Sequence, residues 1–571
     1  MLLPLTEGLS LIYEYRLEIL FLLLGIWAGG ICIINTGILK DLHGLFRYIG
    51  VFCLGFLLLS GATFLIAFLS LFSRTSYLSG CYIISIFAAL LIIKSFITSK
   101  NKTKILVYAF ETTALFLISL AVHLPYLNRI ILPSYSDSPI HYQIIQQILF
   151  PSSGTQSKLA IKNILDTYYH FGYHGITAWL AASSNSSIER SMSFIGQISL
   201  ALIPMSIATA VFMSTKSKWA ALCSGMLASL GWLMPSFALN WGKFPALMAI
   251  STMPIILNLG TSIINEKIKE RATAISFGLL LSCSAITHTR AIVLIILFGI
   301  AVIFISKLKL PEKFEVRKSI IYSFLFLITL STFLNNVSIF FNNPIIGVAL
   351  LFFLPFAFRN YPKEISGLFI FIASIWILEF ILYLLSIKFS LLDTQFISIY
   401  LFIPFSMIGG LGIAGAMEVK FTKLKLFFPL ALILITIFSS PWEASLTPDP
   451  CCTYYTQDDQ NAFNWIQQNT SDEDLFIISV IENTQSHGTD AGIWIHPLTN
   501  RHTNKVIFNT TWKESIINTC NSGKSDIYIY AGGHQYSFSK DILSKLNWVE
   551  AVFEQGKIKI FKVIKCAKSN T

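Results

Sequence analysis

The sequence predicts a polytopic α-helical membrane protein of about fourteen transmembrane helices, followed by a C-terminal extracytoplasmic α/β domain. The first observation is composition, because 54% of the 571 residues are hydrophobic and only 12% are charged. Soluble chains carry roughly 25% charged residues. The second is a series of long apolar stretches, and the third is a polar segment that begins after Pro441. Together they exclude a soluble enzyme, a disordered chain and a coiled coil.

The apolar stretches define the predicted spans. A helix that crosses a bilayer needs about 20 mostly apolar residues. We expect spans at residues 17–39, 48–72, 77–98, 105–124, 191–213, 217–236, 244–262, 272–287, 290–306, 319–335, 344–358, 365–387, 396–416 and 425–441. The chain then divides into a transmembrane domain, 1–441, and a soluble domain, 442–571.

Lysine and arginine are distributed unevenly between alternate loops. One set of loops holds twenty-one of them and the opposite set holds nine. Because basic loops stay in the cytoplasm, we expect the N-terminus, the loop 125–190 and the tail outside it. The net charge of +11 is then explained by cytoplasmic loops, and no nucleic-acid partner is expected. Membrane lipids are the expected surroundings.

Cysteine placement follows the same division. Five cysteines lie in predicted spans, where we expect them to act as small apolar residues. The other four, Cys451, Cys452, Cys520 and Cys566, lie in the tail. An extracytoplasmic tail permits disulfides, but the sequence does not decide which cysteines pair.

The external loop 125–190 contains a predicted amphipathic helix. Pro139 suits the first helical turn, so we expect a helix over 139–150 with Ser138 as its N-cap. Four isoleucines fall on one face of that helix, which is typical of a helix at a membrane surface. They are Ile140, Ile144, Ile145 and Ile148.

Asp137 precedes this helix, and the positive end of a helix favours an ionised carboxylate. Such a carboxylate can activate or orient an acceptor hydroxyl or amide. It can also hold a divalent cation against a phosphate, or simply cap the helix. His141 lies one turn into the helix and is expected to point to the same place.

Residues 168–181 mix histidine, tyrosine and glycine with an apolar continuation. His170 and His174 have the spacing of two metal ligands on a helix. Gly172 lies between them and weakens the helical interpretation, and no third ligand is evident. Stacking on a sugar ring, or packing at the membrane interface, is the favoured role of this segment.

Basic residues at two further external positions suggest a phosphate site. Lys243 begins a span, and His288 and Arg290 lie in a very short external turn. Cations at span ends often only place their charge in the aqueous interface. A lipid phosphate at the outer surface, however, requires cationic partners of this kind.

The tail has the pattern of a small α/β domain. Apolar periodicity predicts a helix and a set of strands. The residues 487–502 form a long, Gly- and Trp-containing connection with Trp494 and Arg501, which is either a binding loop or a plain surface loop. The expected helix is 458–468, and the strands are 475–481, 506–508, 526–531 and a hairpin of 548–553 with 557–563.

These features resemble the GT-C superfamily of integral-membrane glycosyltransferases, in particular bacterial cell-envelope members. The resemblance rests on an aspartate in an early external loop, many spans and an extracytoplasmic α/β tail. The motifs are Asp137-Ser-Pro-Ile-His141, Tyr169-His-Phe-Gly-Tyr-His174, Trp465-Ile-Gln-Gln-Asn-Thr470 and Ala491-Gly-Ile-Trp-Ile-His-Pro-Leu-Thr-Asn-Arg501.

The resemblance implies a polyprenyl-phosphate-linked sugar donor and an inverting transfer outside the cytoplasm, in a bacterial inner or plasma membrane. It implies Asp137 as the catalytic carboxylate. Arg290, with Lys243 or Arg501, would stabilise the leaving phosphate, and Trp494 would stack on sugar. The acceptor is a glycan, lipid or protein. The resemblance does not decide whether a divalent cation such as Mg²⁺ or Mn²⁺ is required.

Two other functions fit the same features. A transporter or flippase of a lipid-linked glycan would use the basic and aromatic residues without making a bond. A glycan ligase or polymerase would perform a neighbouring reaction. An ionised carboxylate at the outer surface argues against the transporter, which does not need one.

Overall fold

The computed structural model describes residues 2–69, 74–98, 102–150, 171–264, 271–334, 343–387, 391–392, 394–418, 427–439, 446–481, 488–509, 511–520 and 526–565. The chain forms two compact units. The helical unit contains Met1–Tyr126, Ile145–Leu239 and Lys243–Thr447. The sheet unit contains Leu127–Ile144, Asn240–Gly242 and Pro448–Thr571. The division therefore departs from a single boundary at 441, because two early segments belong to the unit that the tail builds.

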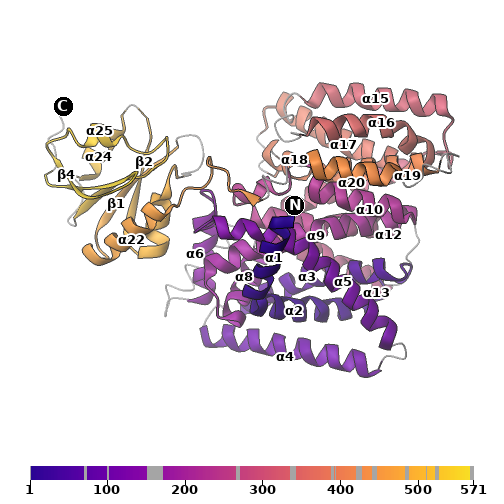
Figure 1. The fold of residues 1–571 in the computed structure, drawn as a ribbon, viewed down its shortest axis with the longest axis horizontal. Helices are drawn as coiled ribbons and strands as arrows, with labels where there is room; N and C mark the ends of the chain where they lie inside the picture. The colour runs from indigo at the N-terminus through magenta and orange to yellow at the C-terminus, as the bar shows by residue number, and fades with distance from the viewer. Residues whose placement is uncertain are drawn as a thin grey trace. The chain divides into compact units, whose positions relative to one another are not determined.

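Helices account for the ordered structure of the helical unit (Figure 1). They are α1 (Leu2–Glu14), α2 (Arg16–Asn35), α3 (Leu45–Leu69), α4 (Arg74–Thr98), α5 (Lys102–His123), α8 (Phe171–Ser184), α9 (Ile188–Thr215), α10 (Lys218–Met226), α12 (Phe244–Ile264), α13 (Arg271–Thr287), α14 (Arg290–Lys307), α15 (Val316–Leu334), α16 (Pro344–Asn360), α17 (Pro362–Leu384), α18 (Thr394–Tyr400), α19 (Phe402–Met417) and α20 (Phe427–Ser439). Three short helices contain residues of both units: η1 (Leu124–Arg129), α6 (Ser138–Leu149) and α11 (Phe237–Asn240).

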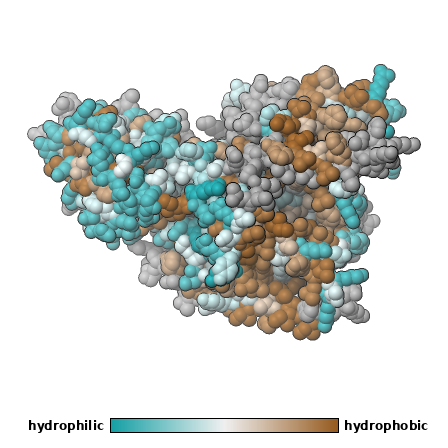
Figure 2. Space-filling view, in the orientation of Figure 1, coloured by the Kyte–Doolittle hydropathy of each residue, from teal (hydrophilic) through white to brown (hydrophobic). Residues whose placement is uncertain are grey.

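Eight helical segments in the described part of the chain are long and apolar enough to cross a membrane, which indicates a membrane protein. Figure 2 shows hydrophobic residues over much of the visible surface of this unit. The segments are Arg16–Asn35, Leu45–Leu69, Lys102–Arg129, Ile188–Thr215, Phe244–Ile264, Arg290–Lys307, Pro362–Leu384 and Phe396–Met417. The shorter apolar helices are Leu78–Lys94, Arg271–Thr287 and Pro344–Asn360.

The predicted span 217–236 is where helix and prediction differ most. Helix α10 ends at Met226, a π turn follows over Leu227–Gly231, Trp232 is extended, and bends and turns lead to Phe237. Pro235 cannot donate the backbone hydrogen bond that a continuing helix needs. The Asn343 amide donates to the Gly231 carbonyl at 3.1 Å, which satisfies one group that the break frees.

Helix α9 lies inside the helical unit, because 94% of its apolar segment is buried. Ser187 caps its start by accepting a hydrogen bond from the Arg190 amide. The Arg190 guanidinium donates to carboxylates of Glu14 and Glu18, both at 2.7 Å. The end of α1, the first turn of α2 and the start of α9 therefore lie together at one end of the helical unit.

The sheet unit has five strands in the order β2-β1-β3-β5-β4. Strand β1 is parallel to both β2 and β3, whereas β5 is antiparallel to both β3 and β4. The strands are β1 (Leu475–Val480), β2 (His502–Ile507), β3 (Ile527–Ala531), β4 (Val549–Gln555) and β5 (Ile558–Val563). The β4–β5 hairpin is confirmed; β2 begins four residues before the predicted strand.

Helices cover both faces of this sheet. Along β1, Phe476 and Ile478 pack on one face with α22 (Gln457–Asn469), η4 (Ala491–Trp494) and α23 (Ile495–Thr499). Ile477 packs on the other face with α24 (Trp512–Cys520) and α25 (Lys540–Leu543). This alternation is the period of a strand. The early segment contributes Leu132, which is buried in the first of these two cores.

Candidate functional site

Asp137 occupies the N-cap of α6. Its carbonyl accepts from the amides of Ile140 and His141, both at 3.1 Å. The predicted cap at Ser138 is therefore wrong by one residue. Ser138 is already helical, and its hydroxyl donates to the Ser134 carbonyl. Asp137 is half-buried, at a helix end that favours a negative charge.

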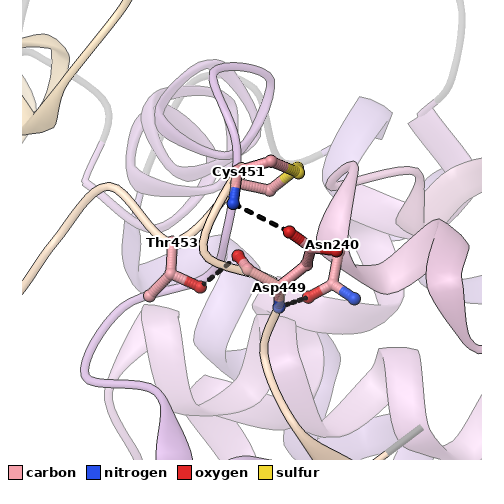
Figure 3. The surroundings of a disulfide bond; sticks show 5 residues. Asn240, Asp449, Cys451 and Thr453 are labelled. Carbon is pink, nitrogen blue, oxygen red and sulfur yellow. Dashed lines mark hydrogen bonds between the residues drawn. A yellow bond between two sulfur atoms is a disulfide. The ribbon is translucent and has the colours of Figure 1, made fainter. Parts of the chain in front are cut away.

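The turn 449–453, here called the disulfide turn, contacts the backbone just before Asp137, and Figure 3 shows the turn with its neighbour Asn240. Cys451 and Cys452 form a disulfide, and the Cys452 carbonyl accepts from the Tyr135 amide at 2.8 Å. The Cys451 amide donates to the Asp449 carboxylate at 2.8 Å, and the Asp449 amide donates to the Asn240 side-chain oxygen at 3.0 Å. Three distant parts of the chain therefore hold one loop.

Aromatic rings continue from this loop toward the sheet. The Tyr135 ring stacks on Tyr454, with centroids 6.1 Å apart, and Tyr454 meets the edge of His534 at 5.1 Å. Burial raises the pKa of Tyr454, and the charges of Asp490 and Asp137 add to the effect. Burial lowers the pKa of His534, whereas hydrogen bonds to the backbone of Cys451 and Pro450 act in the opposite direction.

Asp490 is a buried carboxylate at the carboxyl ends of β1 and β3. Its oxygens accept from the amides of Gly492 at 2.8 Å and Gly532 at 3.1 Å. Burial raises the pKa of Asp490 to about 6. Ligands of open α/β sheets bind at this kind of edge, where the strand order reverses. A side chain at position 532 would collide with the carboxylate, since its Cβ would lie 2.6 Å from an Asp490 oxygen.

Sequence reasoning did not find Tyr454, Asp490 or His534. One signal was available, because Gly532, Gly533 and His534 directly follow a correctly predicted strand. Residues at the carboxyl ends of parallel strands converge on one edge. The parallel pairing that makes this edge a switch point was not predicted.

The residues 488–502 are ordered structure, not an open loop. The Trp494 ring is 1% exposed and belongs to the core of the sheet unit, where Tyr142 meets it edge-on at 5.7 Å. It offers no open face for a sugar, so the expected stacking role is not supported by its position. His487, the first residue of the predicted binding loop, lies outside the described residues.

Arg501 is also held within the sheet unit. Its guanidinium donates to the carbonyls of Thr499 and Thr470 at 2.5 and 2.6 Å, and pairs with Asp472 at 2.8 Å. The side chain is only 11% exposed. These contacts make Arg501 a connector of α22 and α23 to the strand that follows, and they leave little of it for a substrate phosphate.

His141 is 2% exposed, on the first turn of α6. Of the predicted amphipathic face, Ile144 and Ile145 are buried while Ile140 is 41% exposed. The predicted helix is therefore present, but not all isoleucines of its predicted apolar face are buried. The predicted partner of His174 in the 168–174 segment, His170, lies outside the described residues.

In the helical unit, four predicted site residues lie on elements that meet near the start of α8. They are His174, Lys243, His288 and Arg290. His174 is fully buried on α8, in which Gly172 is helical after all. A Cβ at Gly172 would lie 2.8 Å from the Thr287 hydroxyl, so α8 contacts the α13–α14 turn. The neighbouring Tyr173 ring stacks on Phe244 at 5.7 Å, which brings Lys243 at the start of α12 beside the same helix.

His288 and Arg290 share one aromatic neighbour in that turn. The His288 ring stacks on Phe396 at 5.3 Å, and the Arg290 guanidinium carbon lies 5.6 Å from the centre of the same ring. His288 is 6% exposed and Arg290 is half-buried. The α13–α14 turn thus presents a cation on an aromatic surface, a setting in which arginine also binds phosphate.

Metal ligands do not gather in the described ranges: no group of three or more His, Cys, Asp or Glu side chains there is arranged to hold an ion. Asp137 and Asp490 each have other neighbours, as given above.

Comparison with known sequences places the chain in a family. No curated protein matches it. The model of a family of unknown function, DUF6541, matches residues 33–366. That range includes Asp137, His141, His174, Lys243, His288 and Arg290, and it ends before Trp494 and Arg501. The chain belongs to DUF6541.

Proposed function

We propose that the protein is a membrane glycosyltransferase that moves a sugar from a polyprenyl-phosphate donor to an acceptor outside the cytoplasm. The observation that carries this proposal is Asp137, a half-buried carboxylate at a helix start within a loop that other segments hold in place. A fixed carboxylate is suited to accept the proton of an attacking hydroxyl. The acceptor is a glycan, a lipid or a protein.

In this proposal the helical unit binds the donor phosphate. Arg290 is the first candidate, because its guanidinium lies over Phe396 and can form two parallel hydrogen bonds to a phosphate. Lys243, at the start of α12, would add a second cation. His174 and His288 are buried beside them and would position neighbouring groups. A divalent cation such as Mg²⁺ or Mn²⁺ is a further proposed partner of the phosphate.

We propose fourteen spans, with the N-terminus, loop 125–190 and sheet unit outside the cytoplasm of a bacterial inner or plasma membrane. Uneven Lys and Arg counts support this orientation. Glu473→Cys and Lys309→Cys place single thiols on exposed sites. In intact cells an impermeant maleimide should label the first above the wild-type background and leave the second unmodified. The reverse pattern contradicts the orientation.

The enzymatic test compares Asp137→Asn with Glu189→Gln in purified protein given radiolabelled polyprenyl-phosphate sugars. Asparagine still accepts a hydrogen bond at a helix start, so unfolding should change by about 0.5 kcal/mol or less. It cannot act as a base, and transfer should fall about 10²–10⁴-fold. Glu189, an acid in the first turn of α9, is the matched control and should retain wild-type transfer.

Equal transfer by Asp137→Asn and wild type would remove Asp137 from the reaction. Asp166, the remaining acid of the loop, would then be tested in the same assay, whereas a loss of transfer in Glu189→Gln would assign the role to Glu189. Asp166 lies outside the described residues. Transfer by neither wild type nor variant, with any donor, would contradict the glycosyltransferase proposal itself.

A transporter or flippase is the second candidate, and a different observation favours it. His123 and Gln197 are buried on α5 and α9, and among the described residues their side-chain nitrogen and oxygen atoms have no hydrogen-bond partner. Each lies one turn from the contact between Ser119 and Ala201. Unpartnered polar groups inside a membrane bundle often mark a pathway. Lipid-linked glycan movement across liposomes without transfer would support this candidate.

A further inference from the structure

The disulfide joins two residues that are adjacent in the chain, Cys451 and Cys452. Such a bond closes a small covalent ring that contains the peptide bond between them. The ring therefore restricts the backbone of the disulfide turn itself, and it does not connect two distant segments. Cys451 is exposed and Cys452 is 2% exposed, so a solvent thiol can reach the bond from the Cys451 side.

The restricted backbone supplies a hydrogen bond to the Asp137 loop. The Cys452 carbonyl, which belongs to this turn, accepts from the Tyr135 amide at 2.8 Å. Tyr135 has a φ of 70°, a conformation that residues other than glycine rarely adopt. External contacts must hold it there. Asp137 follows two residues later.

The other contacts of the turn are internal to it or reach Asn240, in a segment that also approaches the Asp137 loop. The Asp449 carbonyl accepts from the Cys452 amide at 3.0 Å and the Thr453 hydroxyl at 2.9 Å. Asp449 also binds Asn240 (Figure 3). Two residues on, a Cβ at Gly242 would lie 2.9 Å from the Ser138 hydroxyl. The disulfide turn and the segment 240–242 thus contact each other, and both approach the Asp137 loop.

We propose that Cys451–Cys452 is a reversible thiol–disulfide modification site that controls the position of Asp137. A dithiol reductant attacks the exposed Cys451 sulfur and forms a mixed disulfide, and Cys452 leaves as a thiolate. The second thiol of the reductant then displaces Cys451. The net reaction gives two cysteine thiols and one oxidised dithiol, with two electrons and two protons transferred to the protein.

Reduction opens the ring and frees rotation about the Cys452 N–Cα bond, which is a ring bond, so the carbonyl attached to this Cα can change its direction. The hydrogen bond to Tyr135 is then lost for part of the time. Tyr135 has no glycine-like freedom to hold its φ alone, so the loop that carries Asp137 relaxes. Cys451 and Cys452 act on Asp137 through this loop, as positioning residues, whatever reaction Asp137 serves.

Hydrogen–deuterium exchange of the full chain in detergent tests this proposal. Alkylation without reductant should leave Cys451 and Cys452 unmodified, and alkylation after dithiothreitol should modify both. The peptide 134–141, which reports the Tyr135 amide, should exchange about tenfold faster after reduction. The α22 peptide 457–469 is the internal control and should be unchanged.

A double variant, Cys451→Ser with Cys452→Ser, should exchange at the reduced rate in this peptide and ignore dithiothreitol. Equal exchange of 134–141 in oxidised and reduced wild type overturns the proposal. Alkylation of both cysteines without reductant also overturns it. Because the wild-type comparison needs no variant, the test stands even if the double variant does not fold. None of these readouts depends on glycosyl transfer.

Discussion

The two units hold an arginine in different ways. In the helical unit, Arg190 pairs with Glu14 and with Glu18, whose side chain is 5% exposed, and its guanidinium carbon lies 3.7 Å from the centre of the Tyr15 ring. In the sheet unit, Arg501 donates mainly to backbone carbonyls, and its acidic partner Asp472 is 69% exposed. Removing the arginine from a pair with a buried carboxylate leaves an uncompensated charge, whereas removing it from carbonyl acceptors leaves only neutral groups.

This comparison teaches how to judge a candidate cation. Arg190 and Arg501 are both surrounded by acceptors of the chain itself, so both stabilise the fold. Arg290 lies instead on the Phe396 ring. An aromatic ring beside the guanidinium does not by itself mark a ligand site, because Arg190 lies over the Tyr15 ring and is paired with acids of the chain. The acceptors around Arg501 therefore assign it to the fold of the sheet unit, which its residue type alone did not indicate.

The largest expected effect comes from breaking the buried pair of the helical unit. Arg190→Met removes the cation and leaves the Glu18 carboxylate buried without it. Such a loss costs about 3–5 kcal/mol, because the remaining charge keeps its desolvation penalty. Unfolding in mixed detergent micelles, followed by helical circular dichroism, measures the change.

Lys313→Met is the control for this prediction. The Lys313–Glu418 pair, at 3.0 Å, joins side chains that are 62% and 42% exposed. Exposed pairs contribute about 0–1 kcal/mol, so this variant should unfold almost as wild type does. Equal losses for the two variants would show that burial does not distinguish the pairs.

The second prediction concerns the buried acid of the sheet unit. The raised pKa of Asp490, about 6 against 3.8, means that the folded protein keeps a proton that the unfolded chain releases. The free energy of unfolding should therefore fall as the pH rises from about 4 to about 6, and level off above. Two pKa units correspond to on the order of 3 kcal/mol.

Asp490→Asn isolates this contribution, because asparagine does not titrate. We expect the stability of the variant relative to wild type to rise between pH 4 and pH 7 by the same amount. Urea unfolding followed by near-ultraviolet circular dichroism at several pH values measures the difference. A difference that does not change with pH would mean that Asp490 has an ordinary pKa in the folded protein.

Local patterns predicted the elements of both units well. The apolar stretches are helices, apart from 217–236, and the tail helix 457–469 and the β4–β5 hairpin are where periodicity placed them. Periodicity reports local burial, which decides an element's type. Eight segments of the described residues qualify as spans by length and composition, and the number fourteen stays a prediction.

Long-range assembly could not be predicted in the same way. Tyr135 reaches Cys452, and Asn240 reaches Asp449, across long stretches of chain whose sequences carry no sign of the pairing. The assignment of residues 127–144 to the sheet unit depends on these contacts. Trp494 and Arg501 illustrate the same limit, because residue type suggested binding whereas tertiary contacts bury them.

The smallest predicted effect tests the structural role of Arg501. Its contacts argue against the role on the leaving phosphate that the resemblance implied for Arg501. Loss of charged hydrogen bonds to Thr470 and Thr499 should instead destabilise the sheet unit by about 2 kcal/mol. Transfer per folded molecule should match wild type. Asp472→Ala, which removes only the exposed partner, should cost about 0.5 kcal/mol or less. If Arg501→Ala unfolds like wild type but raises the KM for the donor, Arg501 contacts the substrate. Its carbonyl contacts then do not determine the stability of the sheet unit.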